Sequence, residues 1–136
     1  MKTLSIIAAT FLMTCLTNAQ DKGNLTVSFD QISQDKGELY IGIFEKDNFL
    51  RQPKIGKTIK VSQKNKQVIF ENLPHGEYAV SVFQDLNANQ QFDMDDYGRP
   101  AEPWVMSGNV NPEQMPIWDD AKFTFDSNSK TIALKL

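Results

Sequence analysis

The sequence predicts an all-β fold, an antiparallel β-sandwich of two sheets with about seven strands and a long loop before the last ones. Short runs of alternating apolar and polar residues recur along the chain, and helical periodicity is nearly absent. Asp, Asn, Ser and Gly, which favour tight turns, stand between these runs. At 136 residues, the chain is long enough for one domain and short for two.

Residues 1–19 are typical of an export signal. They carry a lysine at position 2, continue with an almost wholly apolar run, and end with small residues at Thr17 and Ala19. These small residues fit the positions that signal peptidase reads, so we expect cleavage after Ala19. The sequence therefore predicts a secreted or periplasmic domain that comprises residues 20–136.

A lipid anchor on Cys15 is the alternative fate of this segment. It has weaker support, because Thr14 is larger than the residue that usually precedes an acylated cysteine. Cleavage after Ala19 would remove the only cysteine, so the remaining domain must fold without disulfides. No later apolar run is long enough to span a membrane.

The strands are expected where apolar residues alternate with polar ones, because such segments bury one face and leave the other in water. In chain order these segments are Leu25–Phe29, Leu39–Ile43, Ile59–Val61, Val68–Phe70, Tyr78–Val82, Phe123–Phe125 and Ile132–Leu136. Residues 34–37 and 126–129 have the composition of tight turns. Two connections lack the alternation, residues 46–57 and residues 85–120. The second is much longer than usual, which favours a functional role.

Residues 85–120 also concentrate the negative charge of the chain. They hold eight acidic residues against a single base, Arg99, whereas the whole chain has a formal net charge of −3. Like charges held this close repel one another unless solvent or a cation offsets them. The net negative charge also argues against nucleic acid as a partner, since a nucleic-acid binder needs basic surface.

The start of this segment has the oxygen spacing of a calcium-binding loop, in which alternate residues turn inward. The candidate ligands are Asp85, Asn87, Asn89, the carbonyl of Gln91, Asp93 and Asp96. Two positions depart from the usual pattern: Gln90 stands where such loops have glycine, and Asp96 where they have glutamate. The alternative is that these Asp and Asn residues form solvated turns and bind no ion.

Both tryptophans, Trp104 and Trp118, lie in the same long connection. They could form a platform for a sugar or a partner peptide. The alternative is that the loop folds back over one open end of the sandwich and builds a satellite apolar cluster. Large aromatic side chains are more often buried than displayed, which favours the cluster.

Residues with catalytic potential are few. The single histidine, His75, stands in a predicted turn, and Asp93 with Glu102 could be drawn as the acid and base of a glycoside hydrolase. In a segment with eight acids, however, such a pair would arise by chance. A non-catalytic module is therefore favoured over a hydrolase.

The stretch Val68–Val82 resembles the "F-x-N-L-P-x-G-x-Y-x-V" hairpin of transthyretin-like and carboxypeptidase-regulatory-like sandwiches. Further residues resemble a bacterial secreted family called domain of unknown function 2141 (DUF2141), over most of residues 24–136. They are Asp85, Asn87, Asn89, Asp93, Gly98–Trp104, Ser107 and Ala121–Phe123. The resemblance implies secretion and a transthyretin-like or immunoglobulin-like sandwich, and it carries no assigned activity.

Family members typically have glycine at the positions of Ala88 and Gln90 and an aromatic residue at that of Met106. Two functions stay open for this chain. One is a secreted module whose acidic loop binds calcium; the other is a metal-independent module that binds an extracytoplasmic protein or glycan through Trp104 and Trp118.

Overall fold

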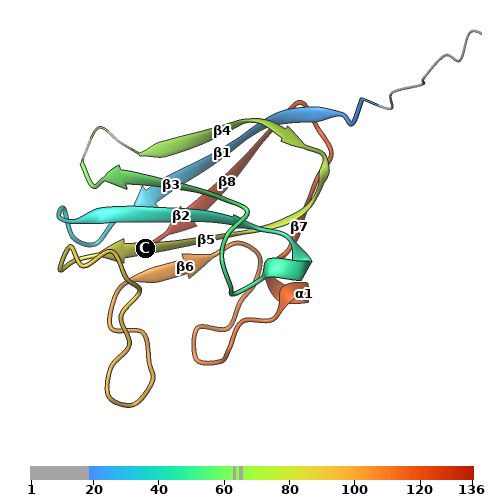
Figure 1. Cartoon of the computed structure of the whole chain (residues 1–136). Helices are drawn as coiled ribbons and strands as arrows, with labels where there is room; N and C mark the ends of the chain where they lie inside the picture. Colours follow the sequence, from blue (N-terminus) through green and yellow to red (C-terminus); the bar gives the residue numbers. More distant parts are fainter. Residues whose placement is uncertain (1–18, 63, 65) are drawn as a thin grey trace, which may run out of the picture.

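The computed structural model describes residues 19–62, 64 and 66–136, which form two β-sheets packed face to face (Figure 1). The predicted all-β sandwich is therefore confirmed. The expected export signal, with Cys15, lies outside the described residues apart from Ala19, and it stays a prediction. In the part of the chain that is described, no helix is long and apolar enough to cross a membrane.

The described part contains eight strands and two short helical segments. The strands are β1 (Lys22–Gln31), β2 (Glu38–Phe44), β3 (Ile55–Lys60), β4 (Gln67–Pro74), β5 (Gly76–Asp85), β6 (Trp104–Met106), β7 (Phe123–Phe125) and β8 (Ser129–Lys135). A 3₁₀ turn, η1, covers Lys46–Asn48, and a single helical turn, α1, covers Trp118–Ala121. One sheet has the order β4-β1-β8 and the other β3-β2-β5-β6, with β7 also paired to β5.

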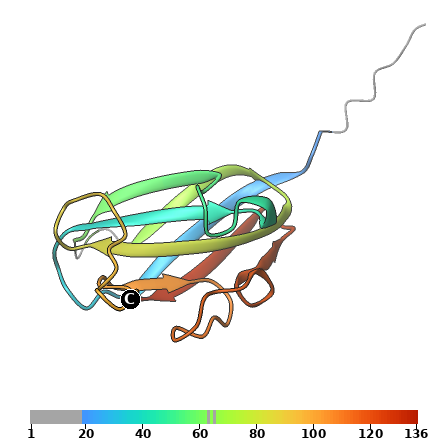
Figure 2. The same cartoon turned by 60° about the horizontal axis from the view of Figure 1, so that its bottom comes forward.

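One pairing departs from the antiparallel prediction. β1 pairs antiparallel with β4 but parallel with β8, so that Val27 faces Val68 on one side and Ile132 on the other. A parallel pair cannot be joined by a tight hairpin. No hairpin is needed here, because β1 and β8 are the first and last strands of the chain. The chain enters β8 from β7, which pairs with β5 of the opposite sheet, so it crosses between the layers just before β8 (Figure 2).

Two expected connections contain strand. Residues 85–120 include β6 and α1, and residues 46–57 include the beginning of β3 at Ile55. β6 has only three residues, Trp-Val-Met, which is too short for alternation to be recognised in the sequence. The predictions of long strandless connections are therefore wrong in these two places.

The core lies between the sheets and follows the predicted alternation. Along β5, Tyr78, Val80 and Val82 face inward and are at most 2% exposed. The inward residues of the other strands complete the core cluster, namely Leu25, Val27, Phe29, Leu39, Ile41, Ile43, Val68, Phe70, Leu73, Phe125 and Leu134. The intervening residues of β5, among them Ser81 and Phe83, face away from this core, onto the outer face of the five-stranded sheet.

The predicted hairpin within residues 68–82 is instead a corner between the two sheets. β4 pairs with β1 and β5 pairs with β2, so the two strands that flank His75 do not pair with each other. The buried Tyr78 hydroxyl donates a 2.7 Å hydrogen bond to the Pro74 carbonyl and holds the corner. Burial raises the pKa of this hydroxyl. The sequence pattern found the tight chain reversal but not the change of sheet.

A buried serine joins β5, β6 and α1. The Ser107 hydroxyl accepts a 2.8 Å hydrogen bond from the Val80 amide and donates a 2.7 Å bond to the Ala121 carbonyl. Ser107 is only 2% exposed, so both backbone groups would lack this partner in a dry environment if the hydroxyl were removed.

We predict that Ser107→Ala lowers the free energy of unfolding by about 2 kcal/mol, because it leaves two buried backbone groups without this hydrogen-bond partner. Urea denaturation followed by circular dichroism measures this change. Ser81→Ala on β5 is the matched control, since no hydrogen bond of the Ser81 hydroxyl is present among the described residues, and it should change stability little. Equal effects of the two substitutions would contradict the role given to Ser107.

Candidate functional site

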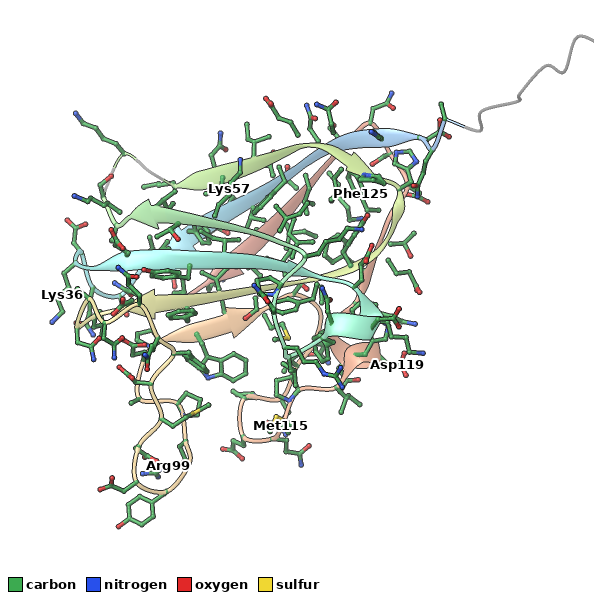
Figure 3. The ribbon with its side chains drawn as sticks, in the orientation of Figure 1. Lys36, Lys57, Arg99, Met115, Asp119 and Phe125 are labelled. Carbon is green, nitrogen blue, oxygen red and sulfur yellow. The ribbon has the colours of Figure 1, made fainter. Side chains whose placement is uncertain are left out.

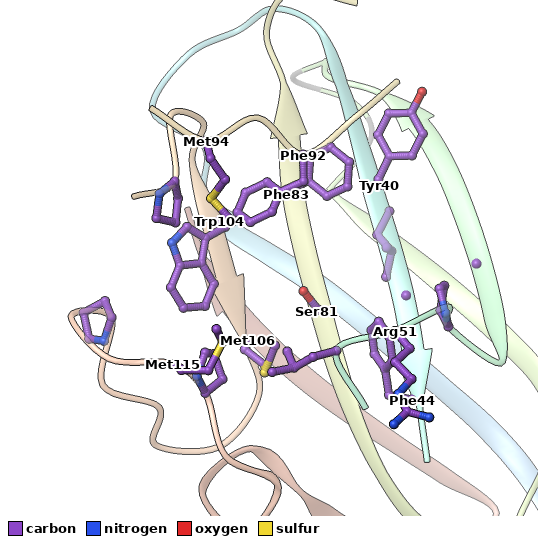
Figure 4. Close-up of a pocket in the computed structure, with 18 of the residues that line it drawn as sticks. Tyr40, Phe44, Arg51, Ser81, Phe83, Phe92, Met94, Trp104, Met106 and Met115 are labelled. Atoms are coloured by element: carbon purple, nitrogen blue, oxygen red, sulfur yellow. The ribbon is translucent and has the colours of Figure 1, made fainter. Parts of the chain in front are cut away.

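A row of aromatic side chains crosses the outer face of the five-stranded sheet. The strand register places Phe83 of β5 between Tyr40 of β2 and Trp104 of β6. The Tyr40 and Phe83 rings are stacked, with centroids 4.9 Å apart and planes within 7° of parallel. Phe92, from the loop after β5, packs on Phe83 with a centroid distance of 5.3 Å (Figure 4). The row thus forms a continuous aromatic surface.

The next row across the same face has small side chains. Gly56, Gly42 and Ser81 are neighbours on β3, β2 and β5, and Met106 follows on β6. Small residues lower the floor of the sheet next to the aromatic row. At one end the floor is covered, because a Cβ atom on Gly42 would stand only 3.0 Å from the Cβ of Pro53.

The two rows form the floor of a groove of about 1190 Å³. The loop between β5 and β6 flanks it on one side and the segment 112–116 on another, and Figure 3 shows Arg99 and Met115 on these two projecting loops. Four of its lining residues are large apolar side chains with high exposure. They are Leu50 (43%), Phe92 (37%), Met94 (55%) and Met115 (79%). Apolar exposure gathered in this way is typical of a binding surface.

The two tryptophans have different environments. Trp104 is half-buried and lines the groove, whereas Trp118 packs edge-on against Phe49 with ring centroids 5.5 Å apart and is not among the lining residues. Both belong to a second apolar cluster around Phe44, Ala79, Met106 and Ala121. This is the predicted satellite cluster, but it covers the outer face of the five-stranded sheet and not an open end of the sandwich.

The acidic loop is organised by Asp85, the last residue of β5. Its side chain is fully buried and accepts hydrogen bonds from the backbone amides of Ala88 at 2.7 Å and Gln90 at 2.8 Å. A carboxylate that satisfies backbone amides in this way fixes the path of the chain. Asp85 therefore sets the shape of the loop from inside the protein.

Glu102 closes the same loop from its far end. It is 6% exposed, and its two oxygens accept from the backbone amides of Leu86 at 3.0 Å and Asp93 at 3.3 Å. The Asp93 carboxylate accepts in turn from the side-chain amides of Asn87 at 2.7 Å and Asn89 at 2.8 Å. Asp93 and Glu102, the pair considered for glycoside hydrolysis, are thus both engaged in holding the loop.

The structure brings together some of the predicted calcium ligands. Asp85, Asn87, Asn89 and Asp93 share one hydrogen-bonded turn, and the Gln91 amide donates to the Asn89 side chain at 3.0 Å. Asp96 lies exposed in the following turn, with no hydrogen bond to the other five.

The side-chain nitrogens of the two asparagines, and not their oxygens, face the Asp93 carboxylate. Across residues 19–62, 64 and 66–136, no three His, Cys, Asp or Glu side chains are placed to share a metal ion. Calcium binding would therefore require Asn87 and Asn89 to turn their oxygens inward.

A second small turn projects beyond the calcium-like one. Met94 and Pro100 form an isolated β-bridge at its base, and Asp95 accepts from the Arg99 backbone amide and guanidinium at 2.9 and 2.8 Å. These contacts, the backbone hydrogen bond first, lower the pKa of Asp95. The Arg99 guanidinium also lies over the Tyr97 ring. The one base of the acidic segment is therefore already paired.

Two residues of the acidic loop have a backbone conformation that disfavours their side chains. Ala88 has a φ of 61° and Gln90 a φ of 63°, in the left-handed region where glycine is favoured. Gln90 stands where calcium loops have glycine, and its positive φ is the conformation that glycine adopts there without strain.

These observations define a class of protein, a two-sheet β-sandwich with an open aromatic groove and an adjoining acidic loop. The chain belongs to a bacterial family described as uncharacterized protein conserved in bacteria (DUF2141), whose family model matches residues 27–133. This confirms the resemblance to DUF2141 seen in the sequence. No curated protein and no solved structure was found to match the chain.

Most of the groove was missed in the sequence, which pointed only to Trp104. A signal was nevertheless present. The predicted strands Leu39–Ile43 and Tyr78–Val82 have apolar residues at their inward positions. Tyr40 is an outward residue of the first strand, and Phe83 is the outward residue that directly follows the second. Apolar residues on one face of a strand and aromatic residues on the other indicate that the second face is also covered or binds a ligand.

We predict that Ala88→Gly and Gln90→Gly each raise the free energy of unfolding by about 1 kcal/mol, because glycine relieves the left-handed strain. Thermal unfolding of the single variants measures this gain. Ala101→Gly in the same connection is the control, since Ala101 is not among the residues with positive φ, and it should lower stability. A loss of stability in all three variants would show that no strain is stored at Ala88 and Gln90.

Proposed function

We propose that the chain is a secreted, non-catalytic binding module that holds an apolar ligand in the groove on the outer face of the five-stranded sheet. The observation that carries this proposal is the gathering of exposed Leu50, Phe92, Met94 and Met115 around one groove. Leaving apolar surface in water costs about 25 cal/mol per Å², so a ligand that covers it gains the corresponding free energy.

The architecture of the groove also supports ligand binding. Its floor consists of paired strands, whose hydrogen bonds hold Tyr40, Phe83 and Trp104 in fixed positions. Its walls come from two long connections, where binding residues are often found. The volume of about 1190 Å³ lies slightly above the roughly 300–1,000 Å³ of typical small-molecule sites, so the groove has room for a ligand of that class.

The acidic residues support a non-catalytic role. Asp85 and Glu102 are buried acceptors for backbone amides, and Asp93 accepts from two asparagines. His75, the only histidine of the chain, lies at the corner between the sheets, with its ring 3.1 Å from the Ser127 carbonyl, and does not line the groove. Secretion rests on the sequence of residues 1–19 alone.

We predict that the domain of residues 20–136 binds the neutral fluorescent probe N-phenyl-1-naphthylamine, whose emission rises in apolar surroundings. Ser81→Trp should abolish the rise, because the indole would fill the groove from its floor. Thr131→Trp is the control, since Thr131 is exposed on β8 of the opposite sheet, and it should bind the probe normally. Absence of binding to the unsubstituted domain, or equal binding by both variants, would contradict the proposal.

Calcium binding by the acidic loop is a second candidate function. It is favoured by the buried carboxylates of Asp85 and Glu102, for which no ion pair exists among the described residues. A bound cation would offset the repulsion between them and Asp93.

We predict that calcium at 100 times its dissociation constant raises the free energy of unfolding by about 2.7 kcal/mol. Thermal unfolding with millimolar calcium and then with excess chelator measures the difference. Asp85→Asn and Asp93→Asn should remove the response, whereas Asp126→Asn, outside the loop, should keep it. An identical melting temperature in calcium and in chelator would refute this second function.

A further inference from the structure

The charged side chains that line the groove indicate the polarity of its ligand. The described part of the chain contributes four of them, Arg51, Lys57, Arg99 and Glu113. Two are already occupied: Lys57 donates to the Ile69 carbonyl and lies over the Phe70 ring, and Arg99 forms a 2.7 Å ion pair with Asp95. Arg51 and Glu113 are therefore the two that remain for a ligand.

Arg51 is the free cation of the groove. Its backbone amide donates to the Asn48 carbonyl at 2.9 Å, which fixes the chain at this point. Its guanidinium is exposed and makes no ion pair or hydrogen bond with the described residues. In Figure 4, Arg51 lies beside Phe44 at one end of the groove, Met94 lies at the other end, and Ser81 lies between them. Among the described basic residues of the lining, the one without a partner thus stands at one end of an apolar groove.

Negative charge is concentrated at the opposite end. Phe92 and Met94, which line that end, belong to the loop that also carries Asp93, Asp95 and Asp96. Arg99 on the same loop pairs with Asp95, so Asp93 and Asp96 leave the loop with a net negative charge. The free carboxylate of Glu113 adds a further negative charge on a separate wall, the segment 112–116. An anionic group would be repelled from these walls and attracted to Arg51, while an apolar group can contact Phe92 and Met94 without electrostatic cost.

We infer that the groove binds a carboxylate-bearing amphiphile, an acyl chain of the fatty-acid type. Its carboxylate pairs with the Arg51 guanidinium, which can donate two parallel hydrogen bonds to a carboxylate. Its chain passes over Ser81 and along the aromatic row to Phe92. This inference rests on the proposed function, since it names the ligand class of the same groove.

The test uses three ligands with the same twelve-carbon chain, dodecanoate, dodecanol and dodecylamine, each below the concentration at which it aggregates. Displacement of N-phenyl-1-naphthylamine at pH 7.5 gives their affinities. We predict that dodecanoate binds about tenfold more tightly than dodecanol, because only its carboxylate forms a charge-assisted hydrogen-bonded pair with Arg51. Dodecylamine should bind most weakly.

Arg51→Gln should remove the preference for dodecanoate and leave the affinity for dodecanol unchanged, because only the charged contact is lost. Glu113→Gln is the matched control on the other free charge. It should not weaken dodecanoate binding, since it removes a repulsive group. A preference for dodecanoate that survives in Arg51→Gln would overturn the assignment of this arginine.

The outcomes separate the inference from the proposed function. Equal affinities for dodecanoate and dodecanol would overturn the inference and leave the apolar groove as a binding site. Failure of the probe itself to bind would refute the proposed function. Sedimentation of the ligand-free domain as a dimer, dissociated by Ser81→Trp, would show that a second copy occupies the groove and would also overturn the inference.

Discussion

The alternation of side chains along β5 is the constraint on which the rest of the structure depends. Its inward residues, Tyr78, Val80 and Val82, lie in the core between the sheets, and its outward residues Ser81 and Phe83 form part of the groove floor. A shift of the strand by one residue would exchange the two sets and destroy both. Pairing with β2, β6 and β7 fixes the register. The core and the candidate site are thus two faces of one strand.

The end of β5 also determines the acidic loop. Asp85 is the last strand residue, and its buried carboxylate holds the Ala88 and Gln90 amides while both residues have positive φ. Glu102, just before β6, accepts hydrogen bonds from the backbone amides of Leu86 and Asp93 and so holds the end of the loop next to its beginning. The negative charge of the segment is therefore partly structural, because carboxylates are the acceptors that the turn's amides use. The same loop positions Phe92 over Phe83 and so forms one end of the groove.

The predictable and unpredictable parts of this structure differ in physical origin. Alternation found the core strands, because burial of one face leaves a period of two in the sequence. It missed β6 and the start of β3, which are short or polar. The motif at Val68–Val82 was read as a hairpin, because a tight reversal at Pro74 does not reveal which sheet the next strand joins. The charge and the oxygen spacing located the acidic loop. The groove depends on residues of four strands and several loops brought together by register, such as Gly42 and Ser81, and only Trp104 marked it in the sequence.

The groove is tested most directly by mapping amide chemical shifts in the domain of residues 20–136 as N-phenyl-1-naphthylamine is added. We expect the largest changes on β2, β5 and β6, around Tyr40, Ser81 and Trp104, with further changes in the segment 112–116. The amides of β1, β4 and β8 should remain almost unchanged, because they form the opposite sheet. Largest changes on those three strands would contradict the assignment of the groove as the binding site.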